Sequence, residues 1–281
     1  MSYYKILGLE QEPFSTSPDS VFFYESPEHK AALMRLLIEI RLKRGLSLIL
    51  GDPGTGKTTL SRKLFHMLKE RDDIIFHMIL DPTYETEELF LHSLVKTFHL
   101  SIADEDTTLL GFKEAIKKYL LHKFVENKIV VLLIDEAQKL NTLSLEILRM
   151  LLNYETNEYK MLQLVLLSQM EILPRLHEMR NLWDRINIKY CLNPLDEKET
   201  KEMIGFRIRQ AGYCGEALFT DDALSEIYRY TQGYPRRIAM LCHHAIKELV
   251  MENKFIVDGE LIRGLIAGEV KMHGAMMLSS S

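Results

Sequence analysis

Residues 51–58 read Gly51-Asp52-Pro53-Gly54-Thr55-Gly56-Lys57-Thr58, which matches the phosphate-binding loop pattern G-x-x-x-x-G-K-[ST]. Glycine adopts backbone angles that residues with a Cβ reach only at a cost, so the loop can curl until several N–H groups point at one anion. Lys57 adds a positive charge for the β- and γ-phosphates, and Thr58 offers a hydroxyl to Mg²⁺. The helix expected to begin near Gly56 presents its positive end to the same phosphates.

The flanking sequence favours a binding loop over a glycine-rich turn without a ligand, which is the alternative interpretation. Residues 46–50 read LSLIL, an apolar run typical of a buried strand, and residues 59–68 have apolar side chains at helical spacing. A strand before the loop and a helix after it are the context that this motif requires. The residues predicted to surround the nucleotide phosphates are therefore Gly51, Asp52, Pro53, Gly54, Thr55, Gly56, Lys57, Thr58 and Thr59.

A second stretch, residues 128–136, reads KIVVLLIDE and ends an apolar run with two acids. Such a run is typical of a strand buried on both faces of a parallel sheet, and ligands gather at the carboxyl ends of these strands. Asp135 is suited to bind Mg²⁺, directly or through water, and Glu136 to orient and deprotonate an attacking water. The alternative is an acidic cap on the next helix. The phosphate-binding loop elsewhere in the chain favours the catalytic interpretation.

The composition is that of a soluble globular protein, with 281 residues, 47% hydrophobic and 27% charged. A net charge of −5 argues against a protein that coats nucleic acid by charge alone. The longest aliphatic run, residues 129–134, is too short to span a bilayer, and the N-terminus does not resemble a signal peptide. Cys191, Cys214 and Cys242 have no metal or redox spacing, which indicates reduced thiols. These features predict a cytoplasmic protein.

The distribution of expected elements divides the chain into four parts. Residues 1–45 are expected to form an N-terminal extension and a first helix that pack on the core. Residues 46–193 alternate five strands with helices, which predicts a three-layer αβα core with a five-stranded parallel sheet. Residues 194–270 contain only helical patterns and are expected to form a small lid, and residues 271–281 a flexible tail.

Two short stretches leave alternatives open. Arg41, Lys43 and Arg44 end the first predicted helix, where they complement its dipole; so few charges neutralise little phosphate, which argues against nucleic-acid binding. Ser168 and Gln169 end the strand predicted over residues 162–167. A polar side chain there could bind the γ-phosphate or the attacking water, but a plain strand-end turn explains the local sequence equally well.

The whole arrangement resembles the AAA+ ATPases: five strands alternating with helices, a loop after the first, an acid pair after the third, and a helical lid. The N-terminus narrows the resemblance to the ExeA/GspA family, which contains secretion-pathway ATPases and has relatives that act with transposases in the manner of TnsC, TniB and MuB. The residues that carry it are Leu7-Gly8-Leu9, Pro13-Phe14, Pro18-Asp19, Tyr24, Ser26, His29, Ala31-Ala32-Leu33, Asp135-Glu136-Ala137-Gln138 and Gly233-Tyr234-Pro235-Arg236.

The resemblance implies roles for individual residues. Lys57 and Thr58 match the Walker A pair, and Asp135 and Glu136 the Walker B pair. Ser168 or Gln169 matches sensor 1, although many relatives have glycine at the position of Ser168. Arg185 matches an arginine finger that reaches the ATP of a neighbouring subunit, and Arg236, beside Arg237, matches the sensor 2 arginine of the lid. For both arginines, a surface ion pair is the alternative.

The expected function is therefore that of an AAA+ hydrolase that binds and hydrolyses ATP with Mg²⁺ and switches a homo-oligomeric ring or filament. The main alternative is a nucleotide-gated platform that binds duplex DNA and recruits a transposase, and another is a scaffold with a vestigial site. Secretion members often continue into a membrane segment and a peptidoglycan-binding domain. This sequence shows neither, which weakens the expectation of a secretion partner at the cell envelope.

Overall fold

The computed structural model describes residues 3–15, 21–102 and 107–279 of the chain. The chain forms two compact units, one of residues 27–53 and 57–192, here called the α/β unit, and one of residues 1–26, 54–56 and 193–281, here called the helical unit. The division between the last strand and the lid helices falls between Leu192 and Asn193.

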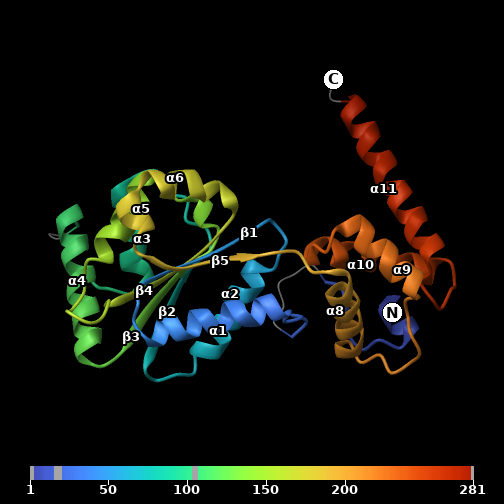
Figure 1. Cartoon of the computed structure of the whole chain (residues 1–281), viewed down its shortest axis with the longest axis horizontal. Helices are drawn as coiled ribbons and strands as arrows, with labels where there is room; N and C mark the ends of the chain where they lie inside the picture. The colour runs from blue at the N-terminus through green and yellow to red at the C-terminus, as the bar shows by residue number, and fades with distance from the viewer. Residues whose placement is uncertain (1–2, 16–20, 103–106, 280–281) are drawn as a thin grey trace. The chain divides into compact units, whose positions relative to one another are not determined.

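Five parallel strands form the sheet of the α/β unit, in the order β2-β3-β4-β1-β5 (Figure 1). All residues of β1, β3 and β4 are buried, because these strands are interior and helices cover both faces. This sheet confirms the predicted five-stranded parallel architecture. The strands are β1 (Leu46–Gly51), β2 (Ile74–Ile79), β3 (Ile129–Ile134), β4 (Leu162–Ser168) and β5 (Ile186–Leu192).

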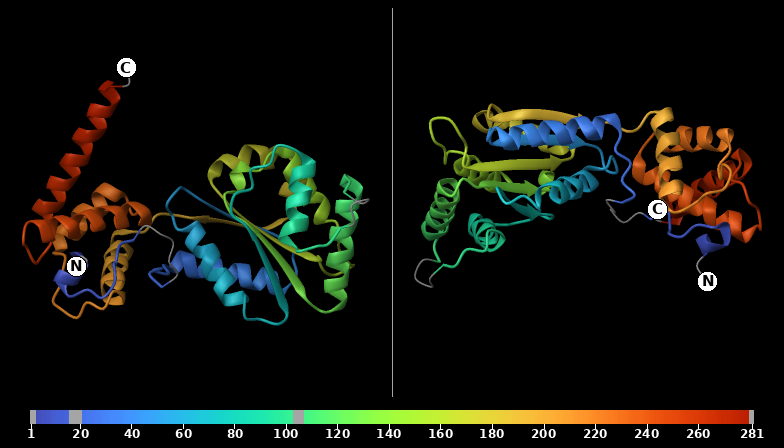
Figure 2. Two further views of the ribbon diagram at one scale, coloured as in Figure 1. Left: turned by 180° about the vertical axis from the view of Figure 1, so that it is seen from behind. Right: turned by 90° about the horizontal axis from the view of Figure 1, so that it is seen from below.

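Helices pack on both faces of this sheet and make the predicted three layers (Figures 1 and 2). Alternate strand residues such as Leu48, Leu132 and Leu164 join one continuous core with the apolar faces of α3, α4 and α5. The opposite face of the sheet is covered by α1 and α2. The elements of these layers are α1 (Pro27–Arg41), α2 (Lys57–Leu68), α3 (Glu87–Thr97), α4 (Leu109–Val125), η3 (Ala137–Lys139), α5 (Thr142–Leu151), η4 (Met170–Ile172), α6 (Leu173–Glu178) and α7 (Arg180–Trp183).

The helical unit has four helices around a core of its own. Asp196 caps the first of them with a capping box: its carboxylate accepts from the N–H of Glu199, 2.7 Å away, and the Glu199 carboxylate accepts from the N–H of Asp196 at 3.0 Å. Thr220 caps the second, and Pro235 begins the third. The helices are α8 (Glu197–Gln210), α9 (Asp221–Thr231), α10 (Pro235–Met251) and α11 (Gly259–Ser279).

The N-terminal segment packs on the helical unit, which corrects the expectation that residues 1–45 pack on the ATPase core. Leu9, Phe14 and Phe22 are buried in the same core as α8, α9 and α10. The Arg207 guanidinium of α8 donates to the carbonyls of Phe22, at 3.1 Å, and Pro13, at 3.4 Å. Helix α1 belongs to the α/β unit. The turn-rich segment has no periodic apolar face, so its sequence did not indicate which core its aromatic side chains would join.

Two further expectations concern the C-terminal tail and the N-terminal sequence motif. Helix α11 continues to Ser279, through residues that were expected to form a flexible tail, because no proline or clustered polar run ends its helical pattern before Ser279. The Pro18-Asp19 pair of the N-terminal signature lies outside the described residues.

Candidate functional site

The phosphate-binding loop connects β1 to α2, as its pattern predicts. Strand β1 ends at Gly51 and α2 begins at Lys57, one residue later than expected. Gly54 and Gly56 have φ values of 88° and 99°, in the left-handed region where a Cβ is costly. These two glycines make the curled backbone possible, and the loop delivers its N–H groups to the start of a twelve-residue helix.

The Lys57 side chain folds back over this loop. Its ammonium donates to the carbonyls of Gly51 and Asp52, with Nζ–O distances of 2.7 and 2.9 Å. Burial lowers the pKa of this ammonium, and the negative charges of Glu136 and Asp135 oppose that shift. Their electrostatic effect on Lys57 shows that the acid pair of β3 faces the loop after β1, although β4 lies between these two strands.

Asp135 connects the tip of β3 to the start of α2. Its carboxylate accepts a hydrogen bond from the Thr58 hydroxyl and another from the N–H of Glu136, the latter at 2.9 Å. Burial raises the pKa of the Asp135 carboxyl, and these two hydrogen bonds oppose the rise. The sequence-predicted residues Lys57, Thr58 and Asp135 are thus brought together at the carboxyl edge of the sheet.

The donor chemistry of this cluster fits Mg²⁺. Thr58 and Asp135 offer a hydroxyl and a carboxylate, the hard oxygen ligands that Mg²⁺ prefers. Within the described residues, no group of three or more His, Cys, Asp or Glu could hold a metal ion. In nucleotide sites Mg²⁺ takes one or two protein oxygens together with phosphate oxygens and water, and Thr58 and Asp135 could supply the protein oxygens.

Glu136 is held by a network of amides. Its backbone is left-handed, with φ 51° and ψ 37°, a conformation that costs a non-glycine residue about 1 kcal/mol or more. Its carboxylate accepts from the amide nitrogen of Gln138 at 2.5 Å and from that of Gln169 at 3.5 Å. The Gln138 carbonyl oxygen in turn accepts from the Ser168 hydroxyl, at 3.3 Å, and from the N–H of Gln169, at 3.1 Å. Both sensor 1 candidates are therefore connected to Glu136: Gln169 by a direct hydrogen bond, and Ser168 through the side chain of Gln138.

Gln138 and Arg175 are two members of this network to which the sequence analysis gave no role. Gln138 entered the sequence analysis only as part of a family motif. Its local sequence does not indicate that its side-chain amide connects the end of β3 to the end of β4. The Arg175 guanidinium of α6 donates to the carbonyls of Gln138 and Leu140, which fixes the short helix η3 against α6. Arg175 carried no sequence signal, because its two acceptors are backbone groups more than thirty residues away.

Arg185 lies far from the loop of its own chain. It precedes β5, whose first residue, Ile186, pairs with Leu46 at the start of β1, whereas Gly51 at the end of β1 pairs with Leu192. Six residues of strand at about 3.3 Å each separate the two edges by about 20 Å. Arg185 is therefore not brought to Lys57 within one chain, and its action on a neighbour's ATP stays a prediction.

Arg236 is the second residue of α10 in the helical unit. The neighbouring Arg237 places its guanidinium 5.3 Å from the centre of the Tyr234 ring, in a cation–π contact. The guanidinium of Arg237 is therefore held against an aromatic ring by this cation–π contact, which distinguishes it from Arg236. The sensor 2 role of Arg236 stays a prediction.

The comparisons with known proteins agree with this geometry. A family model described as "AAA domain" matches residues 40–176. General secretion pathway protein A of Aeromonas hydrophila is 37% identical over 246 residues, which make up 87% of this chain and 44% of that protein. The chain thus spans less than half the length of this curated relative.

Solved structures share the fold at low sequence identity. The ORC2 protein of Aeropyrum pernix, solved as ADPNP–ADP complexes, superposes with a TM-score of 0.63 at 17% identity over 88% of this chain and 71% of that chain. Cdc6p from Pyrobaculum aerophilum gives 0.64 at 18% identity, over 85% and 68% of the two chains. The RuvB branch migration motor of Thermotoga maritima gives 0.55 at 17% identity, over 87% and 72%.

The loop after β1, the acid pair after β3 and these matches place the chain among the AAA+ P-loop ATPases. Within that class, the chain belongs to the family of General secretion pathway protein A, called GspA or ExeA. Among the residues that the structure describes, no helix has the length and apolar character needed to cross a membrane.

Proposed function

We propose that this chain hydrolyses ATP with Mg²⁺ and that it does so in an assembly of copies. The observation that carries the proposal is the hydrogen bond between Thr58 and Asp135, which joins the phosphate-binding loop to the acidic tip of β3. A loop that binds phosphate and a carboxylate that binds Mg²⁺ act on one ligand only if they meet, and here they do.

Each residue has a part in phosphoryl transfer. Loop N–H groups and the Lys57 ammonium bind the phosphates, and Thr58 and Asp135 would hold Mg²⁺, which neutralises charge on the phosphate oxygens when it is bound. Glu136 accepts a proton from the attacking water, and Ser168 and Gln169 orient that water or the γ-phosphate. Arg236 binds the phosphates from the lid, and Arg185 of a neighbouring copy stabilises the charge of the transition state.

The Gln138 amide gives Glu136 a defined position before reaction. A carboxylate that accepts a hydrogen bond at 2.5 Å is held in one orientation. The hydrogen bonds from Gln138 and Gln169 both go to Oε2 of Glu136, so Oε1 can accept the proton of the water while the amides hold the carboxylate in place.

Glu136→Gln and Lys57→Ala test the activity. We expect Glu136→Gln to bind ATP normally and to lose at least about a hundredfold in turnover, because the base is removed while the loop is intact. Lys57→Ala is expected to lose most nucleotide affinity. Glu146→Gln is the matched control, since Glu146 is an acid on α5 that pairs with Arg149 at 2.7 Å. Wild-type turnover in Glu136→Gln would remove the assignment of the base.

The similarity to GspA supports a partner in a secretion assembly as the first proposal for the physiological role. The cellular site is proposed to be the cytoplasm, where ATP is available. Co-purification of the chain with its partners, in the presence of a slowly hydrolysed ATP analogue, tests this role. Recovery of transposase and duplex DNA in place of secretion proteins would support the alternative, a nucleotide-gated DNA platform.

A further inference from the structure

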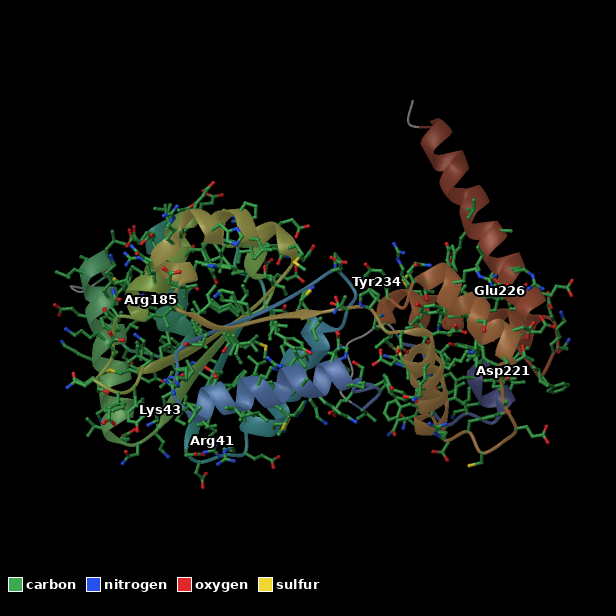
Figure 3. All side chains as sticks on the ribbon, in the orientation of Figure 1. Arg41, Lys43, Arg185, Asp221, Glu226 and Tyr234 are labelled. Atoms are coloured by element: carbon green, nitrogen blue, oxygen red, sulfur yellow. The ribbon has the colours of Figure 1, made fainter. Side chains whose placement is uncertain are left out.

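A cavity of about 480 Å³ opens where β1 and β5 begin, at the edge of the sheet opposite the phosphate-binding loop. Its volume lies in the range of small-molecule sites. Figure 3 labels two of its lining residues, Lys43 and Arg185, on the α/β unit. Four of the lining residues are cations, Lys43, Arg44, Lys160 and Arg185, and two are acids, Glu155 and Glu158.

One wall of this cavity is a turn held in place by two side-chain amides, of which that of Gln163 is buried and that of Asn187 is exposed. Gly45 has a φ of 98°, and its N–H donates to the side chain of Gln163 at 2.9 Å. The Asn187 amide of β5 donates to the carbonyl of Arg44 at 2.7 Å. Lys160 donates its N–H to the carbonyl of Lys43 at 3.1 Å. The backbone of residues 43–45 is therefore fixed beside Arg185, and Arg44 projects from a rigid support.

The four cations differ in how their charges are satisfied. Lys160 forms an ion pair with Glu155. The Lys43 ammonium lies 5.3 Å from the ring centres of both Phe124 and Tyr159. Among the described residues, neither Arg44 nor Arg185 has a carboxylate within ion-pair distance, and Nη1 of Arg185 is buried without a hydrogen-bond partner. A buried guanidinium nitrogen without an acceptor is costly. Arg185 as a whole is half-buried and lines the cavity, where an anion from outside the chain would offset that cost.

We infer that this cavity binds the terminal phosphates of ATP held by a neighbouring copy, and that Arg44 contacts them together with Arg185. The inference rests on the proposed function, and it adds a second residue acting in trans. Two guanidinium groups offer the forked donors that match phosphate oxygens in pairs. The fixed turn at residues 43–45 keeps Arg44 within reach of the anion that Arg185 binds.

The shape and charge of the cavity favour a nucleotide over a nucleic-acid backbone. The site is a compact hollow with two acids on its wall, whereas a duplex is bound along a continuous basic surface. The net charge of −5 adds no long-range attraction for a long polyanion. A triphosphate tip presented by a second protein surface fits the size of the hollow.

Arg44→Ala tests the inference. We expect it to bind ATP with wild-type affinity and to lose about tenfold to a hundredfold in turnover, as when one donor to a transition-state anion is removed. Arg41→Ala is the matched control: it removes the same charge three positions earlier, and Arg41 pairs with Asp73 at 2.8 Å, outside the cavity. Equal turnover in the two variants would overturn the inference. Melting temperatures check that both variants are folded.

Mixing of variants shows whether Arg44 acts on a neighbour. Glu136→Gln subunits bind ATP, do not hydrolyse it, and carry intact arginines. When they are added in equal amount to Arg44→Ala subunits, we expect turnover to rise several-fold above the sum of the separate rates. No rise would mean that Arg44 acts within its own chain, which contradicts the inference.

Arg185→Ala separates the inference from the proposed function on which it rests. If Glu136→Gln rescues Arg185→Ala but Arg44→Ala behaves like Arg41→Ala, the trans arrangement holds and the role of Arg44 is wrong. If Glu136→Gln does not rescue Arg185→Ala, the trans arrangement itself fails. If Arg44→Ala keeps full turnover but loses a gel shift of duplex DNA, the cavity serves DNA and the inference is overturned.

Discussion

The two edges of the five-stranded sheet carry charges that are satisfied in different ways. At the carboxyl edge, Lys57 donates to loop carbonyls, Asp135 accepts from Thr58, and Glu136 accepts from Gln138. At the amino edge, Arg44 and Arg185 line a cavity, and Nη1 of Arg185 is buried without an acceptor among the described residues. These charged groups of the first edge have partners within the chain, whereas Arg44 and Arg185 of the second have no carboxylate within ion-pair distance among the described residues. A division of one active site between two copies predicts this contrast.

The largest expected effect comes from removing Arg185. Arg185→Ala should lower turnover by about a thousandfold, because a trans arginine stabilises charge that develops only in the transition state. ATP affinity, measured by titration with a fluorescent analogue, should not change, since Arg185 lies about 20 Å from the loop of its own chain. A loss of ATP affinity equal to the loss of turnover would mean that Arg185 acts on the nucleotide of its own chain, and the proposed difference between the two edges would be wrong. Arg180→Ala, which removes the arginine that begins α7, is the control.

The next effect concerns the carboxyl edge alone. Gln138→Ala should lower turnover by about tenfold or more, because Glu136 loses the amide that orients it. Comparison of kcat with KM separates a positioning role from a structural one. The value of kcat should fall while KM for ATP stays constant, since Gln138 is not among the residues proposed to bind the nucleotide. Gln210→Ala, at the exposed end of α8, should leave both quantities unchanged. A wild-type kcat in Gln138→Ala would contradict the positioning role.

A smaller effect concerns the support of the amino edge. Gly45→Ala should destabilise the fold by about 1–2 kcal/mol, because φ is 98° and a Cβ would lie 2.8 Å from Cγ of Lys160. Chemical denaturation measures this change. Turnover should fall while ATP affinity stays constant, since the strained turn carries Arg44. Gly264→Ala is the control, because a Cβ there meets nothing within 4 Å. Equal stability of the two variants would show that the turn is not constrained.

The smallest effect, opposite in sign, is on the stability of the carboxyl edge. A raised pKa means that the folded state favours the neutral form of Asp135, so this carboxylate costs stability above that pKa and the cost disappears as pH falls. Asp135→Asn should therefore raise the melting temperature at neutral pH without nucleotide, by about 2–4 °C for about 1 kcal/mol. The gain should shrink at acidic pH. A lower melting temperature at pH 7 would mean that the bond to Thr58 outweighs the cost of burial.

The carboxyl edge could be predicted from the sequence because its residues fall in contiguous motifs. Lys57 and Thr58 are adjacent, Asp135 and Glu136 end one apolar run, and parallel strands bring such runs to one edge. The amide network was only partly accessible, since the role of Gln138 depends on the ends of β3 and β4 lying side by side. The family resemblance, and not spacing, pointed to Arg185.

The amino edge and the N-terminal segment could not be predicted in the same way. Arg44 and Arg185 are separated by more than a hundred residues, and only the register between β1 and β5 brings them to one cavity. The sequence analysis took Arg44 as a charge at the end of the first helix, whereas α1 ends at Arg41 and Arg44 lies between α1 and β1. Phe14 and Phe22 showed the same limit, because the local sequence did not indicate the core in which they are buried.

The two hydrogen bonds that Arg175 donates to the carbonyls of Gln138 and Leu140 link the two edges of the sheet along the chain. Arg175 grips the turn that carries Gln138, and ten residues later the same stretch of chain reaches Arg185. Residues 173–185 therefore connect the turn that carries Gln138, at one edge of the sheet, to Arg185, at the other. The midpoint of this stretch is Met179, where α6 gives way to α7 with ψ at 64°. A substitution that loosens the backbone at Met179 should weaken the connection between Arg185 and Gln138 without changing any residue proposed to bind ATP.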